Sequence, residues 1–569
     1  MPGSSIPHNR ILFIMGAVVL VGALVIVRLF QLQIVNGTSY AKRAEDQYVA
    51  ASSEFDRGNI YFTDKDGQTV AAATVETGYK IAIVPARLQD ASAVYDALSS
   101  IISLDREAFF NAAAKTDDPY EEIATRVSAE DGARIDALEL PGVSLFRDKW
   151  RFYPGGPLAA KAIGFVSFKE DALVGSYGLE SFYNDVLTRT SENLSVNFFA
   201  ELFANVQSTV FKNDATVGDI ITSLEPTVQS ELEQAVASVR TRWASDSVGA
   251  IVLDPYTGEI VAMAQVPTFD LNQYRSVDDI GIYTNPLVQS VYEMGSIIKP
   301  IVMASAIDTG AVTPETTYND KGSVQVDDRT IYNFDKKGRG IASMQDVLNQ
   351  SLNTGMVFAQ QQMGKTAFRD YLLDRFRLGE KAGVDLPGEI NGLVGNLKAQ
   401  NSVNYANAAF GQGLATTPLS IVRAFAALAN GGYLVRPHVV TAIQAEDGTT
   451  VTTKLDTGKP ILKPETIATM SAMLVKVVDD GYDRGLAHYS VAAKTGTAQI
   501  ARPGGLGYYD DRNLHSLIGY FPAHKPRFVV YFYNYYPKNN GQFAIQTLAD
   551  PFFGMIQFLA NYYEITPDR

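Results

Sequence analysis

The chain has 569 residues, of which 46% are apolar and 19% charged, and its 48 basic and 62 acidic residues give a formal net charge of −14. This composition excludes a disordered or collagen-like chain, and the length allows about three to five domain-sized units. The absence of cysteine excludes disulfides, thiol nucleophiles and iron–sulfur clusters. Because the five histidines lack metal-ligand spacing and acidic residues dominate, we expect no metal, no other cofactor and no nucleic-acid partner.

Residues 11–27 are uncharged and lie between Arg10 and Arg28, and the apolar character continues to residue 30. About 20 such residues span the hydrocarbon core of a bilayer as a helix. A cleaved signal peptide would have a shorter apolar region followed by small residues at a cleavage site. The sequence therefore predicts an uncleaved membrane anchor within residues 1–35. Basic residues on both sides leave the positive-inside rule undecided, but a single anchor before about 540 soluble residues most simply exports them, so we expect an extracytoplasmic catalytic domain on the bacterial cell membrane.

Residues 36–217 form the second predicted segment. A turn at 64–67 separates two apolar stretches, residues 79–84 alternate like a strand, and residues 91–102 have helical apolar spacing. No motif in this segment requires chemistry, so we expect a mixed α/β spacer or pedestal.

Residues 218–569 have a more regular pattern that predicts one α+β domain. Glu225 and Pro226 open a helix, and residues 249–254 and 259–264 predict a hairpin. Strands at both ends of the segment, around a helical middle, favour one sheet that joins the two ends. The other predicted elements are a helix at 418–430 with Thr417 as its N-cap, strands at 491–500, 514–521 and 528–533, and a last helix at 543–562.

The first chemical motif is Ser296-Ile297-Ile298-Lys299, followed by Pro300. In a helix that begins near Ile297, Pro300 falls in the first turn and Lys299 lies three residues from Ser296 on one face. This pattern fits a serine nucleophile activated by a neutral lysine base. Alone it is a weak motif, and an ordinary helix start is then the better explanation.

The second motif is Ser351-Leu352-Asn353, between predicted helices at 344–350 and 356–361. A loop tip with a hydroxyl and an amide can pass a proton and bind a carbonyl, although serine and asparagine are also common turn residues.

The third motif is Lys494-Thr495-Gly496-Thr497, within a predicted strand. The lysine and the two hydroxyls could hold a carboxylate, and the glycine would let a substrate backbone approach. The alternative is a strand with a solvated lysine.

In this order, the three motifs resemble those of penicillin-binding proteins and β-lactamases. The chain is similar to class B penicillin-binding proteins, the membrane-anchored peptidoglycan D,D-transpeptidases of bacterial division or elongation. Met294 replaces a usual proline before the first motif, and no glycosyltransferase-like segment precedes the catalytic half, so a bifunctional class A enzyme fits poorly. Further similar segments lie at 28–33, 57–60, 66–67, 151–154, 178–180, 292–293, 385–389, 411–413 and 494–499.

The resemblance implies an α+β architecture in three parts. These are a cytoplasmic tip with a transmembrane helix (1–35), a mixed α/β pedestal similar to a dimerisation domain (36–217), and a transpeptidase domain (218–569). The last would have a serine β-lactamase-like antiparallel sheet with a helical subdomain.

The resemblance also implies roles for the motif residues. Ser296 would attack the penultimate D-Ala carbonyl of a donor stem peptide, and Lys299 would take its proton. Ser351 would relay a proton to the leaving amine, assisted by Lys494, while Asn353 holds the donor amide. Thr495, Gly496 and Thr497 would bind the substrate, the two hydroxyls holding its carboxylate, and the backbone N–H groups of Ser296 and Thr497 would form an oxyanion hole.

The expected partners are peptidoglycan stem peptides, β-lactams as covalent inhibitors, membrane lipid around the anchor, and a membrane glycosyltransferase of the shape, elongation, division and sporulation family. A division role is favoured over elongation because no large insertion interrupts the catalytic half. A β-lactam sensor or hydrolase of the same fold and a catalytically silent scaffold remain alternatives.

Overall fold

A computed structural model describes residues 55–169, 172–189, 217–399, 401–455, 458–482, 485–502, 504, 507–539 and 541–569. The predicted anchor lies outside these residues. Within them, no helix combines the length and the apolar character needed to cross a membrane. The anchor therefore stays a prediction.

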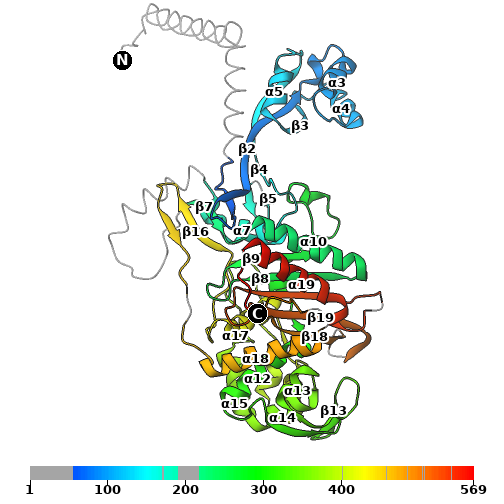
Figure 1. The fold of residues 1–569 in the computed structure, drawn as a ribbon. Coiled ribbons are helices and arrows are strands. Elements are labelled where there is room, and N and C mark those ends of the chain that lie inside the picture. The colour runs from blue at the N-terminus through cyan, green and yellow to red at the C-terminus, as the bar shows by residue number, and fades with distance from the viewer. Residues whose placement is uncertain are drawn as a thin grey trace, which may run out of the picture. The chain divides into compact units, whose positions relative to one another are not determined.

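The chain forms two compact units (Figure 1). The first contains Val75–Arg151, and the second contains Arg57–Thr74, Phe152–Thr188 and the described residues of Ser208–Arg569. Two stretches of the predicted pedestal thus cluster with the carboxy-terminal half, and the boundary at 217/218 stays a prediction.

The first unit packs three helices against antiparallel strands. The helix predicted at 91–102 forms as α3 (Ala91–Ser99), three residues shorter and capped by the Asp90 carboxylate. The strand predicted at 79–84 overlaps the end of β2 (Thr69–Ile83), which stops one residue earlier. Ile81, Leu98 and Phe109 are buried in its core. The other elements of this unit are α4 (Arg106–Ala113), β3 (Glu121–Val127), α5 (Ala129–Asp136) and β4 (Val143–Phe152).

The second unit is built on a five-stranded antiparallel sheet of order β18-β19-β20-β8-β9. The sheet joins strands from both ends of this half of the chain, which confirms the prediction. Residues 248–253 are all buried and apolar or glycine because both faces of the sheet are covered. The strands are β8 (Ser247–Leu253), β9 (Ile260–Val266), β18 (Ala492–Ala501), β19 (Tyr508–Phe521) and β20 (Phe528–Tyr535).

Helices cover the two faces of this sheet in separate layers (Figure 1). One face packs against α10 (Pro226–Trp243) and α19 (Ala544–Tyr562). The other packs against α17 (Pro418–Ala429), whose twelve residues are all buried and whose N-terminus is capped by Thr417, as predicted. Further helices of this layer and the helical subdomain are α11 (Pro286–Gln289), α12 (Lys299–Asp308), α13 (Met344–Asn349), α14 (Asn353–Met363), α15 (Lys365–Arg369), α16 (Ser402–Ala408) and α18 (Pro464–Gly481).

Shorter strands complete the second unit. The turn predicted at 64–67 joins β1 (Ile60–Thr63) to β2, with which it pairs antiparallel. The others are β5 (Val166–Lys169), β6 (Ala172–Gly175), β7 (Gly218–Thr222), β10 (Tyr292–Glu293), β11 (Thr317–Asp320), β12 (Ser323–Val326), β13 (Arg329–Tyr332), β14 (Gly340–Ser343), β15 (Ala415–Thr416), β16 (Val440–Ala445) and β17 (Thr450–Thr452), with short helices α6 (Ala160–Ile163), α7 (Gly178–Phe182) and α8 (Asn184–Leu187).

A buried ion pair fixes segments of the second unit to one another. Arg57 Nε donates to Glu180 Oε2 at 2.6 Å, and the side chains are 1% and 0% exposed. Tyr183 then donates to the Asp385 carboxylate at 3.1 Å, which also accepts the backbone N–H of Val439 at 2.7 Å. Several segments that carry the family resemblance thus hold this unit together.

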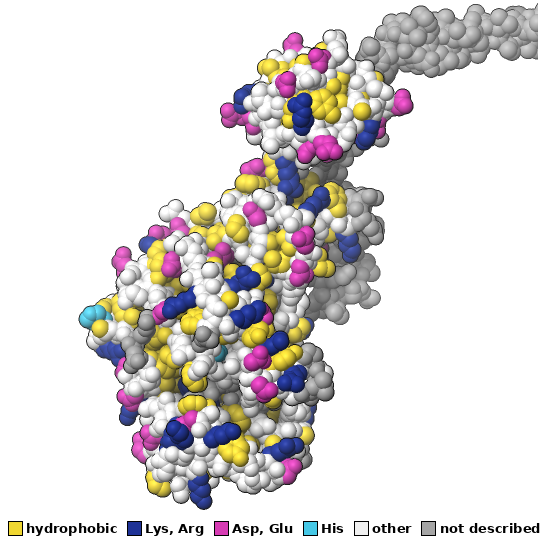
Figure 2. Space-filling model, turned by 90° about the vertical axis from the view of Figure 1, so that its right-hand side faces the viewer, with side chains coloured by type: hydrophobic (Ala, Val, Ile, Leu, Met, Phe, Trp, Pro, Cys, Tyr) yellow, Lys and Arg dark blue, Asp and Glu magenta, His cyan; other side chains and the backbone are white. Residues whose placement is uncertain are grey.

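The surface contributes less to the stability of the fold. On the face that Figure 2 shows, acidic and basic side chains are interspersed with small groups of hydrophobic ones. Exposed pairs such as Arg242 and Asp550, 3.1 Å apart, each contribute about 1 kcal/mol or less. The apolar cores carry the larger free energies.

Candidate active site

Ser296 lies in a tight turn immediately before α12. This 3-10 turn, η5 (Gly295–Ile298), leads directly into α12, and Pro300 occupies the first turn of α12 as predicted. The backbone N–H of Lys299 donates to the carbonyl of Ser296. Gly295 has a φ of +59°, which favours glycine, and its N–H donates to the Gly411 carbonyl at 3.1 Å. The turn therefore holds Ser296 half-buried.

The side chain of Lys299 joins the first motif to the second. Its Nζ donates to the Ser351 carbonyl at 2.7 Å, to Ser351 Oγ at 3.1 Å and to Asn353 Oδ1 at 2.8 Å. These three acceptors match the three N–H donors of an ammonium group. The structure thus brings Lys299 into contact with two residues that lie 52 and 54 positions further along the sequence.

The Ser351 loop lies between two helices, as its sequence predicts. α13 ends at Asn349 and α14 begins at Asn353. Ser351 has a φ of +55°, in the left-handed region. The N–H of Leu352 donates to the Val347 carbonyl at 2.9 Å, which closes the turn.

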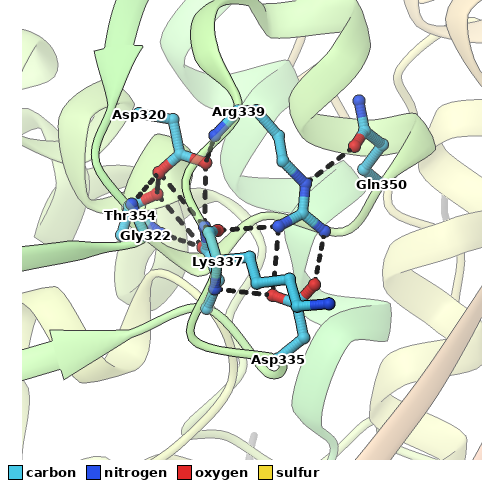
Figure 3. A network of polar contacts seen from close by, with 8 residues as sticks. Asp320, Gly322, Asp335, Lys337, Arg339, Gln350 and Thr354 are labelled. Carbon is cyan, nitrogen blue, oxygen red and sulfur yellow. Dashed lines mark hydrogen bonds and ion pairs between the residues drawn. The ribbon is translucent and has the colours of Figure 1, made fainter.

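A network of polar contacts holds the residues next to this loop (Figure 3). The buried Asp320 carboxylate accepts hydrogen bonds from Thr354 Oγ1 at 2.8 Å and from the backbone N–H of Arg339 at 3.0 Å. Asn333 donates to both oxygens of Asp320 and accepts the N–H of Thr354 at 3.2 Å. Asn353 Nδ2 donates to the Tyr332 carbonyl at 3.0 Å. The β13–β14 loop therefore fixes the start of α14, where Asn353 lies.

The third motif lies on β18, the edge strand of the sheet, beside the turn that carries Ser296. A Cβ atom on Gly496 would lie 2.9 Å from the Met294 carbonyl oxygen and 3.0 Å from Ile297 Cγ2. Gly496 thus lets the turn pack closely on the strand, a second reason for glycine besides the predicted approach of substrate. Thr497 is exposed and Thr495 is half-buried. Thr497 Oγ1 accepts the N–H of Ala544, the first residue of α19, at 3.2 Å.

Two buried lysines set the electrostatics of the site. Lys299 is 0% exposed and Lys494 is 2% exposed. Burial, and then repulsion from Lys494, hold the pKa of Lys299 well below its usual value. Burial lowers the pKa of Lys494 to about 8, and its Nζ donates to the Thr495 carbonyl at 3.1 Å. Both effects make Lys299 lose its proton at a lower pH than an ordinary lysine does.

The supporting residues of the site were not found from the sequence. Asp320 and Asn333 lie 33 and 20 positions before Asn353, with no local pattern that links them to it. Tyr482, which contacts Thr495, lies just beyond a helix end and has no motif of its own. Only their side-chain contacts identify them. Within the described residues, no group of histidine and carboxylate side chains is arranged to hold a metal ion.

Comparisons with known proteins identify the family of the chain. Residues 248–555 match the penicillin binding protein transpeptidase domain, and residues 52–222 match the penicillin-binding protein dimerisation domain. Stage V sporulation protein D of Bacillus subtilis is 30% identical over 562 residues, which cover 96% of this chain and 85% of that protein. Peptidoglycan D,D-transpeptidase FtsI of Buchnera aphidicola is 25% identical over 582 residues, which cover 99% of this chain and 96% of that protein.

A solved structure has the same fold. Penicillin-binding protein 3 from Mycobacterium tuberculosis, complexed with aztreonam, superposes with a TM-score of 0.67 at 24% identity, over 91% of this chain and 98% of its own. Fold and sequence together define a penicillin-binding transpeptidase. The chain belongs to the class B penicillin-binding proteins.

Proposed function

We propose that the protein is a peptidoglycan D,D-transpeptidase that cross-links stem peptides through an acyl-enzyme on Ser296, with a role in septal wall synthesis. One observation carries the catalytic part of the proposal. A buried lysine with a lowered pKa lies three residues after the serine and contacts both polar residues of the second motif. Such a lysine can act as the base that a serine nucleophile requires.

In the acylation step, Ser296 Oγ attacks the carbonyl carbon of the penultimate D-Ala, and its proton passes to the neutral Nζ of Lys299. A neutral amine has two N–H donors and one lone pair, so one of the three contacts of Lys299 must reverse or open. Ser351 Oγ, 3.1 Å from Nζ, is the contact that can reverse, because a hydroxyl both donates and accepts. Ser351 is thus suited to carry the proton to the departing D-Ala amine.

The edge strand supplies the other half of the proposed site. The charge of Lys494 attracts the terminal carboxylate of the donor, and the hydroxyls of Thr495 and Thr497 bind it. The backbone N–H groups of Ser296 and Thr497 stabilise the oxyanion of the tetrahedral intermediate. Asn353 holds the donor amide, and Gly496 leaves room for the donor backbone.

In the second step, the amine of a neighbouring stem peptide attacks the ester of the acyl-enzyme and forms the cross-link. A β-lactam acylates the same serine as its ring C–N bond breaks. The released amine stays attached to the acyl group, so the place of the acyl acceptor remains blocked and the ester persists.

Covalent labelling tests the proposal. A fluorescent penicillin should label the wild-type protein, and Ser296→Ala should abolish labelling while the protein remains folded by circular dichroism. Labelling that survives this substitution refutes the assignment of the nucleophile. Steady hydrolysis of a chromogenic β-lactam would instead favour the hydrolase alternative. A hydrolase needs a base that activates water for rapid deacylation.

The cellular role and the partners belong to the same proposal. The relative named FtsI and the uninterrupted catalytic half support division rather than elongation. We expect a membrane glycosyltransferase of the shape, elongation, division and sporulation family as partner, and attachment to the bacterial cell membrane through residues 11–30. A fluorescent fusion at midcell would support the septal role, whereas a sidewall pattern would favour elongation. If cells grow with Ser296→Ala as their only copy of the protein, the alternative of a catalytically silent scaffold is favoured.

A further inference from the structure

The side chain of Tyr482 reaches from the end of α18 to the edge strand. Its hydroxyl oxygen accepts the backbone N–H of Thr495 at 2.9 Å and lies 3.3 Å from Thr495 Oγ1, to which it donates. The ring packs edge-on against Phe553 of α19, with centroids 6.5 Å apart at an interplanar angle of 73°. One tyrosine hydroxyl therefore contacts both the backbone and the side chain of a single residue.

The backbone contact shows which side of β18 remains open. In an antiparallel strand, the N–H and C=O of alternate residues point to the same side. The N–H of Thr495 donates to the hydroxyl of Tyr482 and therefore points away from β19. The carbonyl of Thr495 accepts a hydrogen bond from Lys494 Nζ. The next residue with groups on that side is Thr497. Tyr482 and Lys494 thus occupy the edge at Thr495, and an added peptide can pair with the strand only from Thr497 onward.

The contact between the Tyr482 and Thr495 hydroxyls determines where the Thr495 hydroxyl proton points. A threonine hydroxyl has one donor and two acceptor sites. Because Tyr482 donates to Thr495 Oγ1, the threonine's own proton is directed to another acceptor. Ala544 acts in the same way on Thr497, whose Oγ1 accepts a backbone N–H at 3.2 Å. Both hydroxyls are therefore oriented as donors, which suits an anion such as a carboxylate.

We propose that Tyr482 is a positioning residue that holds the Thr495 hydroxyl as a hydrogen-bond donor to the carboxylate of the donor peptide or of a β-lactam. This inference rests on the proposed transpeptidase function and adds to it a residue that does not touch the reacting atoms. Burial raises the pKa of Tyr482 to about 12. The phenol therefore stays protonated, and able to donate, in the range where the enzyme works.

The test separates binding from chemistry. Tyr482→Phe keeps the ring that packs on Phe553 and removes only the hydroxyl. With benzylpenicillin, stopped-flow acylation should show about a tenfold weaker noncovalent complex, since a hydrogen bond to a charged group is involved, and an acylation rate constant within about twofold of wild type. Tyr489→Phe is the matched control, because Tyr489 donates to the Ile565 carbonyl at 2.8 Å and does not contact Thr495. It should behave as wild type.

A second variant keeps the test decisive. In a Thr495→Val background, adding Tyr482→Phe should weaken the complex by no more than about twofold, because the hydroxyl that Tyr482 orients is already absent. An unchanged complex in Tyr482→Phe, a loss confined to the acylation rate constant, or a full tenfold effect in the Thr495→Val background would each overturn the inference. If the wild-type protein itself is not acylated at Ser296, the proposed function fails instead.

Discussion

Lys299 Nζ lies 2.7 Å from the carbonyl oxygen of Ser351 and 3.1 Å from its hydroxyl oxygen. The first contact fixes the amine, because a carbonyl can only accept. The second can reverse, because a hydroxyl can also donate. The carbonyl oxygen of Ser351 therefore holds Lys299 in place, and the Ser351 hydroxyl can exchange a proton with it.

The two buried lysines predict a bell-shaped dependence of acylation on pH. Activity should rise as Lys299 loses its proton, and this rise should be complete well below the usual lysine pKa because burial and Lys494 lower it. Activity should fall as Lys494 loses its charge, around its pKa of about 8. The second-order rate constant for benzylpenicillin, measured from pH 5 to 10, checks both limbs. A rate that keeps rising above about pH 9 would contradict the role of Lys494.

Lys299→Arg should reduce acylation by about 10³-fold although it keeps the positive charge. An arginine stays protonated in proteins, so it cannot take the proton of Ser296. The measurement is the rate of penicillin labelling, with the melting temperature as the check on folding. An active Lys299→Arg enzyme would refute the neutral base.

The positive φ of Ser351 predicts different stabilities for two variants that lack its hydroxyl. Ser351→Ala must keep a φ of +55° with a Cβ atom, whereas Ser351→Gly adopts this region freely. Both should lose proton relay, and acylation should fall by about 10²-fold or more in each. The glycine variant should nevertheless be about 1 kcal/mol more stable than the alanine variant in urea unfolding. Equal stabilities would mean that the loop relaxes when the hydroxyl is removed.

The sequence predicts the parts of the site that are local in the chain. Pro300 marks the start of α12, and Thr417 and Pro418 mark the start of α17, because capping depends on a few neighbouring residues. The sheet also follows from its apolar strands. The contacts of Asp320 with Thr354, and of Tyr482 with Thr495, could not be predicted in this way. Both contacts join residues that come together only when separate elements pack. The sequence spacing of the two pairs does not distinguish them from ordinary polar residues.

Asp320→Asn should weaken the support of the second motif. Both oxygens of Asp320 accept hydrogen bonds, from Gly322, Asn333, Arg339 and Thr354. An amide places an NH₂ group against at least one of these donors, which costs about 1–3 kcal/mol. Because Thr354 follows Asn353 at the start of α14, acylation should also fall, by about tenfold. Asp335→Asn, which affects the partly exposed pair with Arg339, is the control and should change both quantities less. Wild-type acylation by Asp320→Asn would show that the loop holds its position without this carboxylate.

Glu180→Ala should destabilise the second unit by about 3–5 kcal/mol, because it removes one partner of a buried ion pair. Arg57 also donates to three neutral acceptors, which are Asn184 Oδ1 at 3.1 Å, Thr188 Oγ1 at 3.2 Å and the Glu180 carbonyl at 2.7 Å. They can bind the guanidinium but cannot balance its charge. Arg242→Ala provides the comparison, since its pair with Asp550 is exposed and its removal should cost about 1 kcal/mol or less. Urea unfolding of both variants measures the difference, and equal effects would mean that water reaches Arg57 when the glutamate is removed.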